Sequence, residues 1–267
     1  MKKLLFLIII PFWYLTSFSQ QNEIEVNYNY CHINPTGIFT CSEMTLITNN
    51  QFSKFYNKIN EKVDSMLSTI EGRVAYSQMM QSAMSNNDFS SLPIKQEPLY
   101  VLKSRNDSIS SVFDLIGTDY WFYQEPLLPQ NWEITDTSDN ILGYDCFLAT
   151  CNYRGRTWKA WFTLEIPIPD GPWKLNGLPG LILKAEDNTG QYSFIGEGIR
   201  LTSKNINHIY GKENYEKTDR IKFLQNMRAF INNPLENLKA SIGAEIQNIP
   251  KVVIDESYDL LETDYHK

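Results

Sequence analysis

Three histidines are available for acid–base or nucleophilic catalysis in this chain: His32, His208 and His266. A Ser–His–Asp triad would have to use His32 or His208, because His266 is the penultimate residue. The motif Gly-x-Ser-x-Gly, which exposes a serine nucleophile on a sharp turn, does not occur. The histidines therefore give no specific signature of a serine hydrolase.

Carboxylates offer a second kind of chemistry, because two of them suffice to cleave a glycosidic bond. Four acidic residues lie in or beside predicted strands and could converge: Asp145, Glu165, Asp170 and Glu186. Isolated signals of this kind are weak, and acidic residues beside strands usually form solvated edges. If the chain is a hydrolase, we expect replacement of Asp170, Glu165 or His208 to abolish turnover.

Motifs for metals and cofactors are absent from the sequence. It contains no His-Glu-x-x-His, no Cys-x-x-Cys, no Walker loop and no dinucleotide-binding glycine pattern. The sequence therefore predicts neither a metal site nor a cofactor.

Two arginines and two tryptophans form a candidate binding surface. Arg154 and Arg156 flank a glycine in a predicted turn, where they can clamp a carboxylate or phosphate, stack on Trp158 and Trp161, or simply keep the turn soluble. Trp161 falls on the polar face of an alternating strand, which indicates contact with another element, a ligand or a partner. Coverage of Trp161 by the following loop, residues 166–180, is the alternative.

That loop belongs to the segment 166–182, which reads IPIPDGPWKLNGLPGLI. Residues 166–180 hold four prolines and three glycines. Proline restricts the chain, and glycine permits positive φ or close backbone approach, so the segment should be stiff. A stiff apolar surface loop that carries Trp173, Leu178 and Pro179 suits recognition, and it equally suits plugging the end of a barrel.

The stretch from Gly143 to about Gly198 resembles the GLPGLI family of exported bacterial envelope proteins. The residues that carry the resemblance are Gly143-Tyr144, Cys146, Tyr153 to Arg156, Trp158 to Thr163, Ile166-Pro167, Gly171-Pro172 and Gly177 to Ile182. The resemblance implies an exported protein of unknown function, without assigned catalytic residues or cofactor.

The N-terminus has the pattern of a secretory signal peptide. Two lysines precede an apolar stretch at residues 4–15, and small residues precede a cleavage point after Ser19. We expect residues 1–19 to be removed and residues 20–267 to form one β-rich domain that is periplasmic or secreted. The apolar stretch is too short to span a membrane, and no later stretch is long enough.

The chain that remains after cleavage is acidic. Removing Lys2 and Lys3 leaves 22 basic against 31 acidic side chains, a formal charge of −9. Nucleic acids and anionic membranes are bound mainly through Lys and Arg. The charge therefore argues against both as main partners.

Four cysteines in an oxidising compartment predict disulfides. Cys31 and Cys41 flank HINPTGIFT, which reads as a hairpin connection, so a bridge across its base is expected. Cys146 and Cys151 lie in one predicted strand, where five residues separate their Cα atoms by roughly 16 Å. They cannot pair with each other, which leaves free thiols or a pairing with Cys31 and Cys41 open.

Most of the chain has the composition and alternation of β-strands. The predicted strands are residues 23–33, 43–48, 99–104, 108–117, 119–126, 132–135, 142–154, 157–165, 181–186 and 192–201. Apolar residues at helical spacing predict helical segments at about 52–84 and 218–242, the second divided at Pro234. The acidic tail after Pro250 is expected to form a final strand with a disordered end.

Consecutive strands joined by short turns predict an antiparallel meander. The expected fold is α+β and mainly β: a curved antiparallel sheet or partly open β-barrel with helices packed near each end. The absence of a catalytic set favours a non-enzymatic binding protein for a protein partner or an apolar small molecule. An envelope hydrolase acting on peptide or glycan and a structural component of an outer-membrane assembly are the alternatives.

Overall fold

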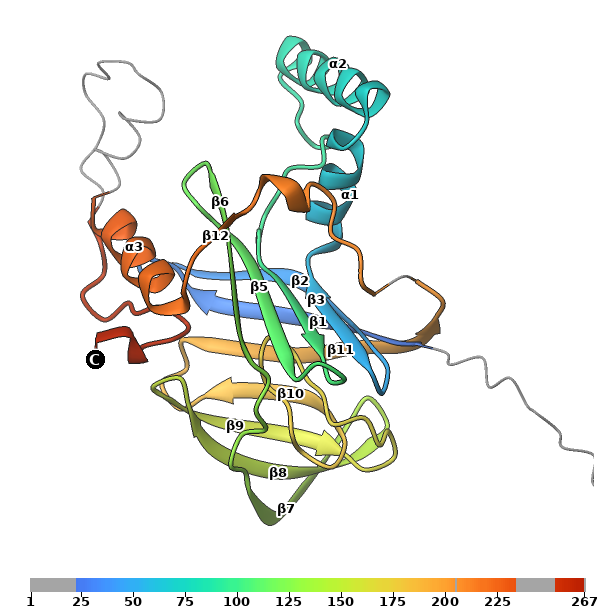
Figure 1. The fold of residues 1–267 in the computed structure, drawn as a ribbon, viewed down its shortest axis with the longest axis vertical. Helices are drawn as coiled ribbons and strands as arrows, with labels where there is room; N and C mark the ends of the chain where they lie inside the picture. Colours follow the sequence, from blue (N-terminus) through green and yellow to red (C-terminus); the bar gives the residue numbers. More distant parts are fainter. Residues whose placement is uncertain (1–22, 205, 234–252, 267) are drawn as a thin grey trace, which may run out of the picture.

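The computed structural model describes residues 23–204, 206–233 and 253–266 (Figure 1). The strands are β1 (Glu23–Ile33), β2 (Phe39–Thr48), β3 (Phe52–Tyr56), β4 (Tyr100–Ser104), β5 (Ile109–Ile116), β6 (Asp119–Pro126), β7 (Glu133–Ile141), β8 (Tyr144–Tyr153), β9 (Arg156–Thr163), β10 (Leu181–Asp187), β11 (Tyr192–Thr202) and β12 (Glu216–Lys217). The α-helices are α1 (Lys58–Leu67), α2 (Ile70–Asn86) and α3 (Arg220–Asn232), and two 3₁₀ turns are η1 (Lys212–Asn214) and η2 (Asp264–His266).

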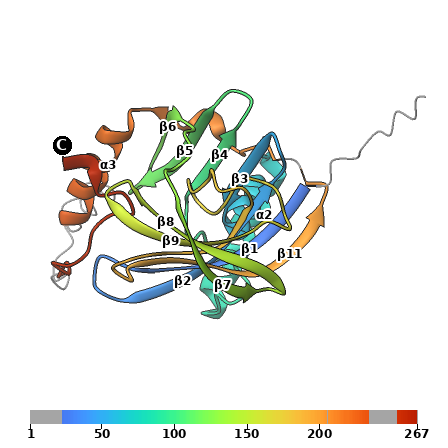
Figure 2. The same cartoon turned by 90° about the horizontal axis from the view of Figure 1, so that it is seen from below.

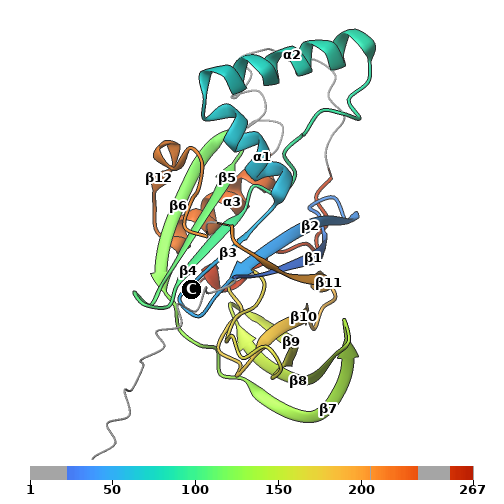
Figure 3. The ribbon, with the colours of Figure 1, turned by 90° about the vertical axis from the view of Figure 1, so that its right-hand side faces the viewer.

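All twelve strands form one sheet in the order β12-β6-β5-β4-β3-β2-β1-β11-β10-β9-β8-β7. The meander β1–β6 joins the meander β7–β11 through the antiparallel pair β1–β11, and only β12 pairs in parallel, with β6. The sheet is not closed into a barrel, and Figures 2 and 3 show that it is strongly bent. The prediction of a mainly β fold with a curved antiparallel sheet is confirmed.

The bend gives the sheet a concave face that carries the larger of two hydrophobic clusters. α3 packs against this cluster through Phe223 and Leu224. The smaller cluster includes Tyr56 and Tyr100, and α1 binds it through a hydrogen bond of 2.6 Å from the Tyr100 hydroxyl to Asp64. The sheet is therefore covered on both faces in its β3–β5 region.

The predicted helical segment 52–84 is wrong in its first part. Phe52–Tyr56 is the strand β3, which pairs with β2 and β4. Phe55 lies in the larger cluster and Tyr56 in the smaller one, so both faces of this strand are apolar and the alternation that marks a strand is missing. The helix begins only after Asn57, whose side chain accepts a hydrogen bond from the backbone N–H of Asn60.

The continuous apolar stripe expected along this helix is also wrong. Thr69 caps a new helix, α2, so the chain turns after Leu67. Ile70 is 69% exposed, and Val74 and Met84 are exposed as well. Figures 1 and 3 show α2 projecting beyond the end of the sheet, where it covers none of the strands.

The helical segment predicted at 218–242 is present as α3, which is capped by the Asp219 side chain. The second helix expected after Pro234 lies outside the described residues, as does the signal peptide at residues 1–19. The tail does not form the expected final strand: residues 255–266 cross the sheet edge in turns and end in η2. Within the part of the chain that the structure describes, no helix is long and apolar enough to cross a membrane.

The proline- and glycine-rich loop between β9 and β10 is not a surface loop. Trp173, Leu175 and Leu178 are at most 2% exposed and belong to the core of the concave face. The loop needs two of its glycines: Gly177 has φ +91°, and a Cβ on Gly180 would lie 1.9 Å from the carbonyl oxygen of Thr163. The prediction of a surface loop is wrong, and because the open sheet has no barrel end to close, the loop instead fills the core of the concave face; we call residues 166–180 the plug loop.

The predicted disulfide between Cys31 and Cys41 is present and joins directly opposed residues of β1 and β2. Cys146 and Cys151 are free and buried in β8, and burial raises the pKa of their thiols to about 11 and about 12. Of the alternatives left open for these two cysteines, free thiols are found.

Replacing Cys31 and Cys41 together with serine is expected to lower the free energy of unfolding by about 2–3 kcal/mol, because the bridge limits the unfolded chain. Urea denaturation monitored by tryptophan fluorescence measures the change. The matched control is the wild-type protein with a thiol reductant, which opens the bridge without changing the sequence and should lose a similar amount of stability. Equal midpoints for the bridged protein and the double variant would show that the bridge adds no stability.

Candidate functional site

A cavity of about 170 Å³ lies between the concave face of the sheet, α3 and the C-terminal segment. Its residues come from β1, β5, β6 and β11, from the segments before β4 and β10, from α3 and from the tail. They are Tyr30, His32, Glu97, Leu99, Val112, Asp114, Tyr123, Trp173, Tyr192, Phe223, Leu224, Met227, Ile231, Tyr258, Leu260, Leu261 and Glu262. We call this space the sheet cavity.

The walls of the sheet cavity are mainly aromatic and aliphatic. Tyr30 stacks on Phe194 at 4.9 Å and on the ring of His32 at 5.1 Å. Tyr123 packs on Phe223 of α3 with ring centroids 5.4 Å apart. Apolar walls with a few polar groups are typical of small-molecule sites.

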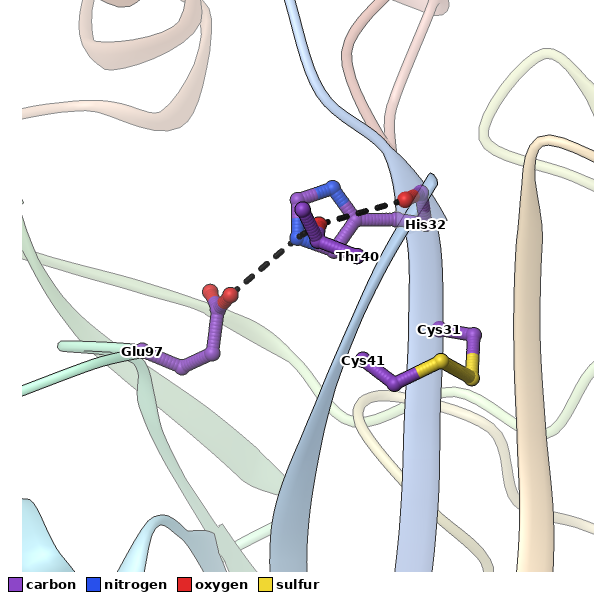
Figure 4. The surroundings of a disulfide bond; sticks show 5 residues. All are labelled: Cys31, His32, Thr40, Cys41 and Glu97. Atoms are coloured by element: carbon purple, nitrogen blue, oxygen red, sulfur yellow. Dashed lines mark hydrogen bonds and ion pairs between the residues drawn. A yellow bond between two sulfur atoms is a disulfide. The ribbon is translucent and has the colours of Figure 1, made fainter. Parts of the chain in front are cut away.

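Polar groups line one end of the sheet cavity. His32 Nε2 lies 3.1 Å from a carboxylate oxygen of Glu97 and 3.2 Å from the Thr40 hydroxyl (Figure 4). Adjacent residues of a strand point to opposite faces, so the ring of His32 points to Glu97 while the neighbouring disulfide of Cys31 lies on the other side of β1 (Figure 4). The disulfide thus fixes β1 to β2 next to the pair His32–Thr40.

Asp114 belongs to the same end of the sheet cavity. The pKa of Asp114 is raised to about 7: burial raises it most, the N–H of Leu115 partly offsets this by donating at 2.7 Å, and the negative charge of Glu97 adds to the rise. A carboxyl group with a pKa near neutrality changes charge in the range in which proteins work.

The tail residues 258–266, which we call the C-terminal strap, form another wall of the cavity through Tyr258, Leu260, Leu261 and Glu262. Arg156 donates at 2.7 Å to the carbonyl oxygen of Leu260 and at 2.7 Å to the carboxylate of Asp187. The N–H of Thr263 donates at 2.9 Å to the carbonyl of Arg154. The β8–β9 turn therefore holds the strap against the sheet edge.

The strap also supplies two carboxylates, Glu262 and Asp264, to an ion-pair network. Glu262 binds Lys174 of the β9–β10 loop and Arg220 of α3, the latter at 2.7 Å. Burial acts to raise the pKa of Glu262, but these cations and Arg154 lower it overall. Three cations (Arg154, Lys174 and Arg220) meet three anions (Glu125, Glu262 and Asp264), so this end is electrically balanced.

Some of the residues predicted as a binding surface lie at the sheet cavity or its strap, and the others lie elsewhere. Arg154 and Arg156 clamp the strap, and Arg156 is buried rather than exposed at a hairpin tip. Trp173 lines the sheet cavity, and Trp158 packs behind it with ring centroids 5.7 Å apart. Together these four residues support the cavity and its strap.

The remaining predicted residues lie elsewhere. Lys184 of β10 lies over the ring of Trp161, with its Nζ 4.2 Å from the ring centroid. Leu178 is buried in the core, and Pro179 is exposed beside it. Neither residue lines the sheet cavity.

The residues proposed for a hydrolase are not brought together. Asp170 is buried between Lys103 and Arg105, Glu165 accepts from the N–H of Asp145, and His208 packs on Tyr210. No hydrogen bond or ion pair joins any two of Asp170, Glu165 and His208 in the described parts of the chain. Over the same residues, no group of three His, Cys, Asp or Glu is arranged to hold a metal ion.

Sequence reasoning missed Glu97, Asp114 and the strap. Asp114 interrupts the apolar alternation of β5, because its neighbours Val112 and Ile116 on the same face are apolar. This charged residue in an otherwise apolar row was the one feature of the sequence that could have indicated the site.

Comparison with known proteins gives a partial family match. Residues 152–184 match a family described as "Protein of unknown function (Porph_ging)". The match covers β9, the plug loop and the hexapeptide Gly177 to Ile182. No curated protein matches the chain.

Solved structures show a shared fold. PNGF-II, in its C2 crystal form, has a TM-score of 0.52 and 16% identity over 78% of this chain and 33% of PNGF-II; its P21 form gives 0.52 and 15% over the same shares. A LolA superfamily protein, NE2245 from Nitrosomonas europaea, has a TM-score of 0.28 and 10% identity over 73% of this chain and 92% of NE2245, a score that does not establish a shared fold. The chain thus spans about a third of PNGF-II, and its similarity to PNGF-II shows the fold alone.

Proposed function

We propose that this chain is an exported protein of the GLPGLI family that binds a small, largely apolar molecule in the sheet cavity. The observation that carries the proposal is the cavity itself: about 170 Å³ of space lined by aromatic and aliphatic side chains, with polar groups at one end. The family match over residues 152–184 supports the lineage, and the disulfide supports an oxidising compartment.

The volume of the sheet cavity limits the size of the ligand. A cavity of roughly 150 Å³ lined by apolar side chains holds benzene. The sheet cavity therefore suits a molecule on the order of seven to nine non-hydrogen atoms, or an apolar side chain of a partner. A contact of that size predicts a Kd on the order of 0.1–1 mM.

Four of the residues predicted as a binding surface form or support the sheet cavity. Trp173 forms part of its wall, Trp158 supports Trp173, and Arg154 and Arg156 hold the strap over it. Trp161, Leu178 and Pro179 remain candidates for contact with an envelope protein partner, of which Trp161 and Pro179 have accessible surface.

A probe titration tests the proposal. We expect 4-fluorotoluene, followed by ¹⁹F NMR, to bind the wild-type protein with a Kd below about 1 mM. Met227→Trp puts a larger side chain into the cavity from α3 and should weaken binding at least ten-fold. Val112→Phe, which fills the cavity from β5, should act in the same direction.

The matched control is Asn226→Trp, which places the same side chain on the exposed side of α3. This variant should bind the probe like the wild type. Near-UV circular dichroism establishes that all three variants are folded. Equal binding by Met227→Trp and wild type, or no wild-type binding at saturating probe, would overturn the proposal.

A further inference from the structure

The three carboxylates that line the sheet cavity differ in their partners. Glu262 of the strap pairs with Lys174 and Arg220. In the described part of the chain, the side chain of Glu97 pairs only with His32, and Asp114 accepts only from the N–H of Leu115. No Lys or Arg side chain pairs with Glu97 or Asp114 among the residues that the structure describes.

A tyrosine hydroxyl lies beside these carboxylates. Tyr30 lines the cavity and is 6% exposed. Its ring contacts His32 and Phe194, and within the described residues its hydroxyl has no hydrogen-bond partner. Burial raises the pKa of Tyr30 most, and Tyr192, Glu97, Tyr258 and Asp114 raise it further, so both carboxylates lie near this residue.

Because the Tyr30 hydroxyl has no partner in the described residues, it can form a hydrogen bond with a molecule in the cavity. Two carboxylates and one hydroxyl supply acceptors for several N–H donors. The electron-rich faces of tyrosine rings also attract cations. An ammonium group can donate hydrogen bonds to the carboxylates and to the hydroxyl, and it can also contact the face of a tyrosine ring.

We propose that the sheet cavity binds a small primary amine, with its ammonium group between Asp114, Glu97 and the Tyr30 hydroxyl and its apolar body toward α3. This inference rests on the proposed ligand-binding function and names the class of ligand. The apolar body would lie against Leu224 and Met227, which face the cavity from α3.

The amine should bind more tightly as pH rises. Because the pKa of Asp114 is raised to about 7, the carboxyl is mostly neutral at pH 6 and mostly ionised at pH 8, while a benzylic amine stays largely protonated. Affinity should rise about ten-fold over this range.

The cavity is lined by other titratable groups as well, and α3 contributes none of them. They are His32 and Tyr30 from β1, Glu97, Tyr123 from β6, Tyr192 from β11, and Tyr258 and Glu262 from the strap.

Two fluorinated probes of nearly equal size test the inference by ¹⁹F NMR at pH 8. We expect 4-fluorobenzylamine to bind at least ten-fold more tightly than 4-fluorobenzyl alcohol. Asp114→Asn should remove this preference, and Glu97→Gln should reduce it. Asp119→Asn, a change at an exposed carboxylate of β6, is the matched control and should keep it.

The outcomes separate the two proposals. If amine and alcohol bind equally well, or if Asp114→Asn keeps the preference, the amine inference is wrong while the ligand-binding function stands. If neither probe binds, both are wrong. An amine preference that disappears at pH 6 and in Asp114→Asn supports both.

Discussion

Replacing Asp170 with alanine is expected to lower the free energy of unfolding by about 3–5 kcal/mol, the cost of breaking a buried ion pair. Asp170 is fully buried, with Lys103 Nζ at 2.5 Å and Arg105 Nη2 at 2.7 Å, and the Thr48 hydroxyl donates to it at 2.6 Å. Removing the carboxylate leaves Lys103, whose side chain is also fully buried, without a counter-charge. The plug loop then keeps only the hydrogen bonds of Lys103 Nζ to the carbonyls of Gly171 and Leu175 as its described side-chain links to β4.

Urea denaturation of Asp170→Ala measures this loss. Asp136→Ala, at an exposed carboxylate of β7, is the matched control and should change stability by less than about 0.5 kcal/mol. An unchanged midpoint for Asp170→Ala would show that the loop does not depend on this ion pair.

The same carboxylate makes stability depend on pH. Burial alone would raise the pKa of Asp170, but Lys103 and Arg105 lower it to about 2. Because the folded pKa lies below the unfolded value of about 3.9, the stabilisation is present above about pH 4 and is lost as pH falls toward 2. The loss amounts to about 2–3 kcal/mol, and it should be missing from Asp170→Ala.

Replacing Arg156 with methionine is expected to release the C-terminal strap and to destabilise the fold by about 3 kcal/mol. The change removes donors to the Leu260 and Asp259 carbonyls and leaves the buried Asp187 without its cation. Methionine keeps much of the side-chain volume, so the effect reports the lost charge and hydrogen bonds.

Hydrogen exchange measured by mass spectrometry follows the strap directly. We expect peptides that cover residues 258–266 to exchange at least ten-fold faster in Arg156→Met, because the Thr263 N–H bond to Arg154 opens with the strap. Lys159→Met, at an exposed cation of the same strand, should exchange like the wild type. Unchanged protection of the strap in Arg156→Met would contradict the role given to Arg156.

Much of the fold could be predicted from local patterns. β1 has the predicted bounds of residues 23–33, and β9 alternates as predicted over Trp158, Ala160 and Phe162, because each of these strands contrasts one face with the other. The disulfide was predictable because a short hairpin loop places Cys31 opposite Cys41.

The failures have a common physical cause. The pattern at β3 predicts a helix although the segment is a strand. Neighbouring strands and both hydrophobic clusters bury it, so its apolar and polar residues do not alternate. The acidic tail was expected to form a final strand with a disordered end, whereas Glu262 pairs with cations on the β9–β10 loop and on α3. Contacts between segments so far apart leave no local pattern.

The same limit applies to the candidate site. Arg154, Arg156 and Trp173 stood out in the sequence because they lie in one short stretch around the plug loop. Glu97 and Asp114 come from separate segments, and only the folded sheet brings them to the cavity that Trp173 also lines. Sequence reasoning identified the supporting side of the site and missed its polar end.

A crystal structure of the protein grown with 4-fluorobenzylamine tests the central claim most directly. The claim predicts electron density for one probe molecule inside the sheet cavity, with its nitrogen within hydrogen-bond distance of Asp114 and its ring against α3. A cavity that holds only water at saturating probe, or one filled by the protein's own side chains, would contradict it.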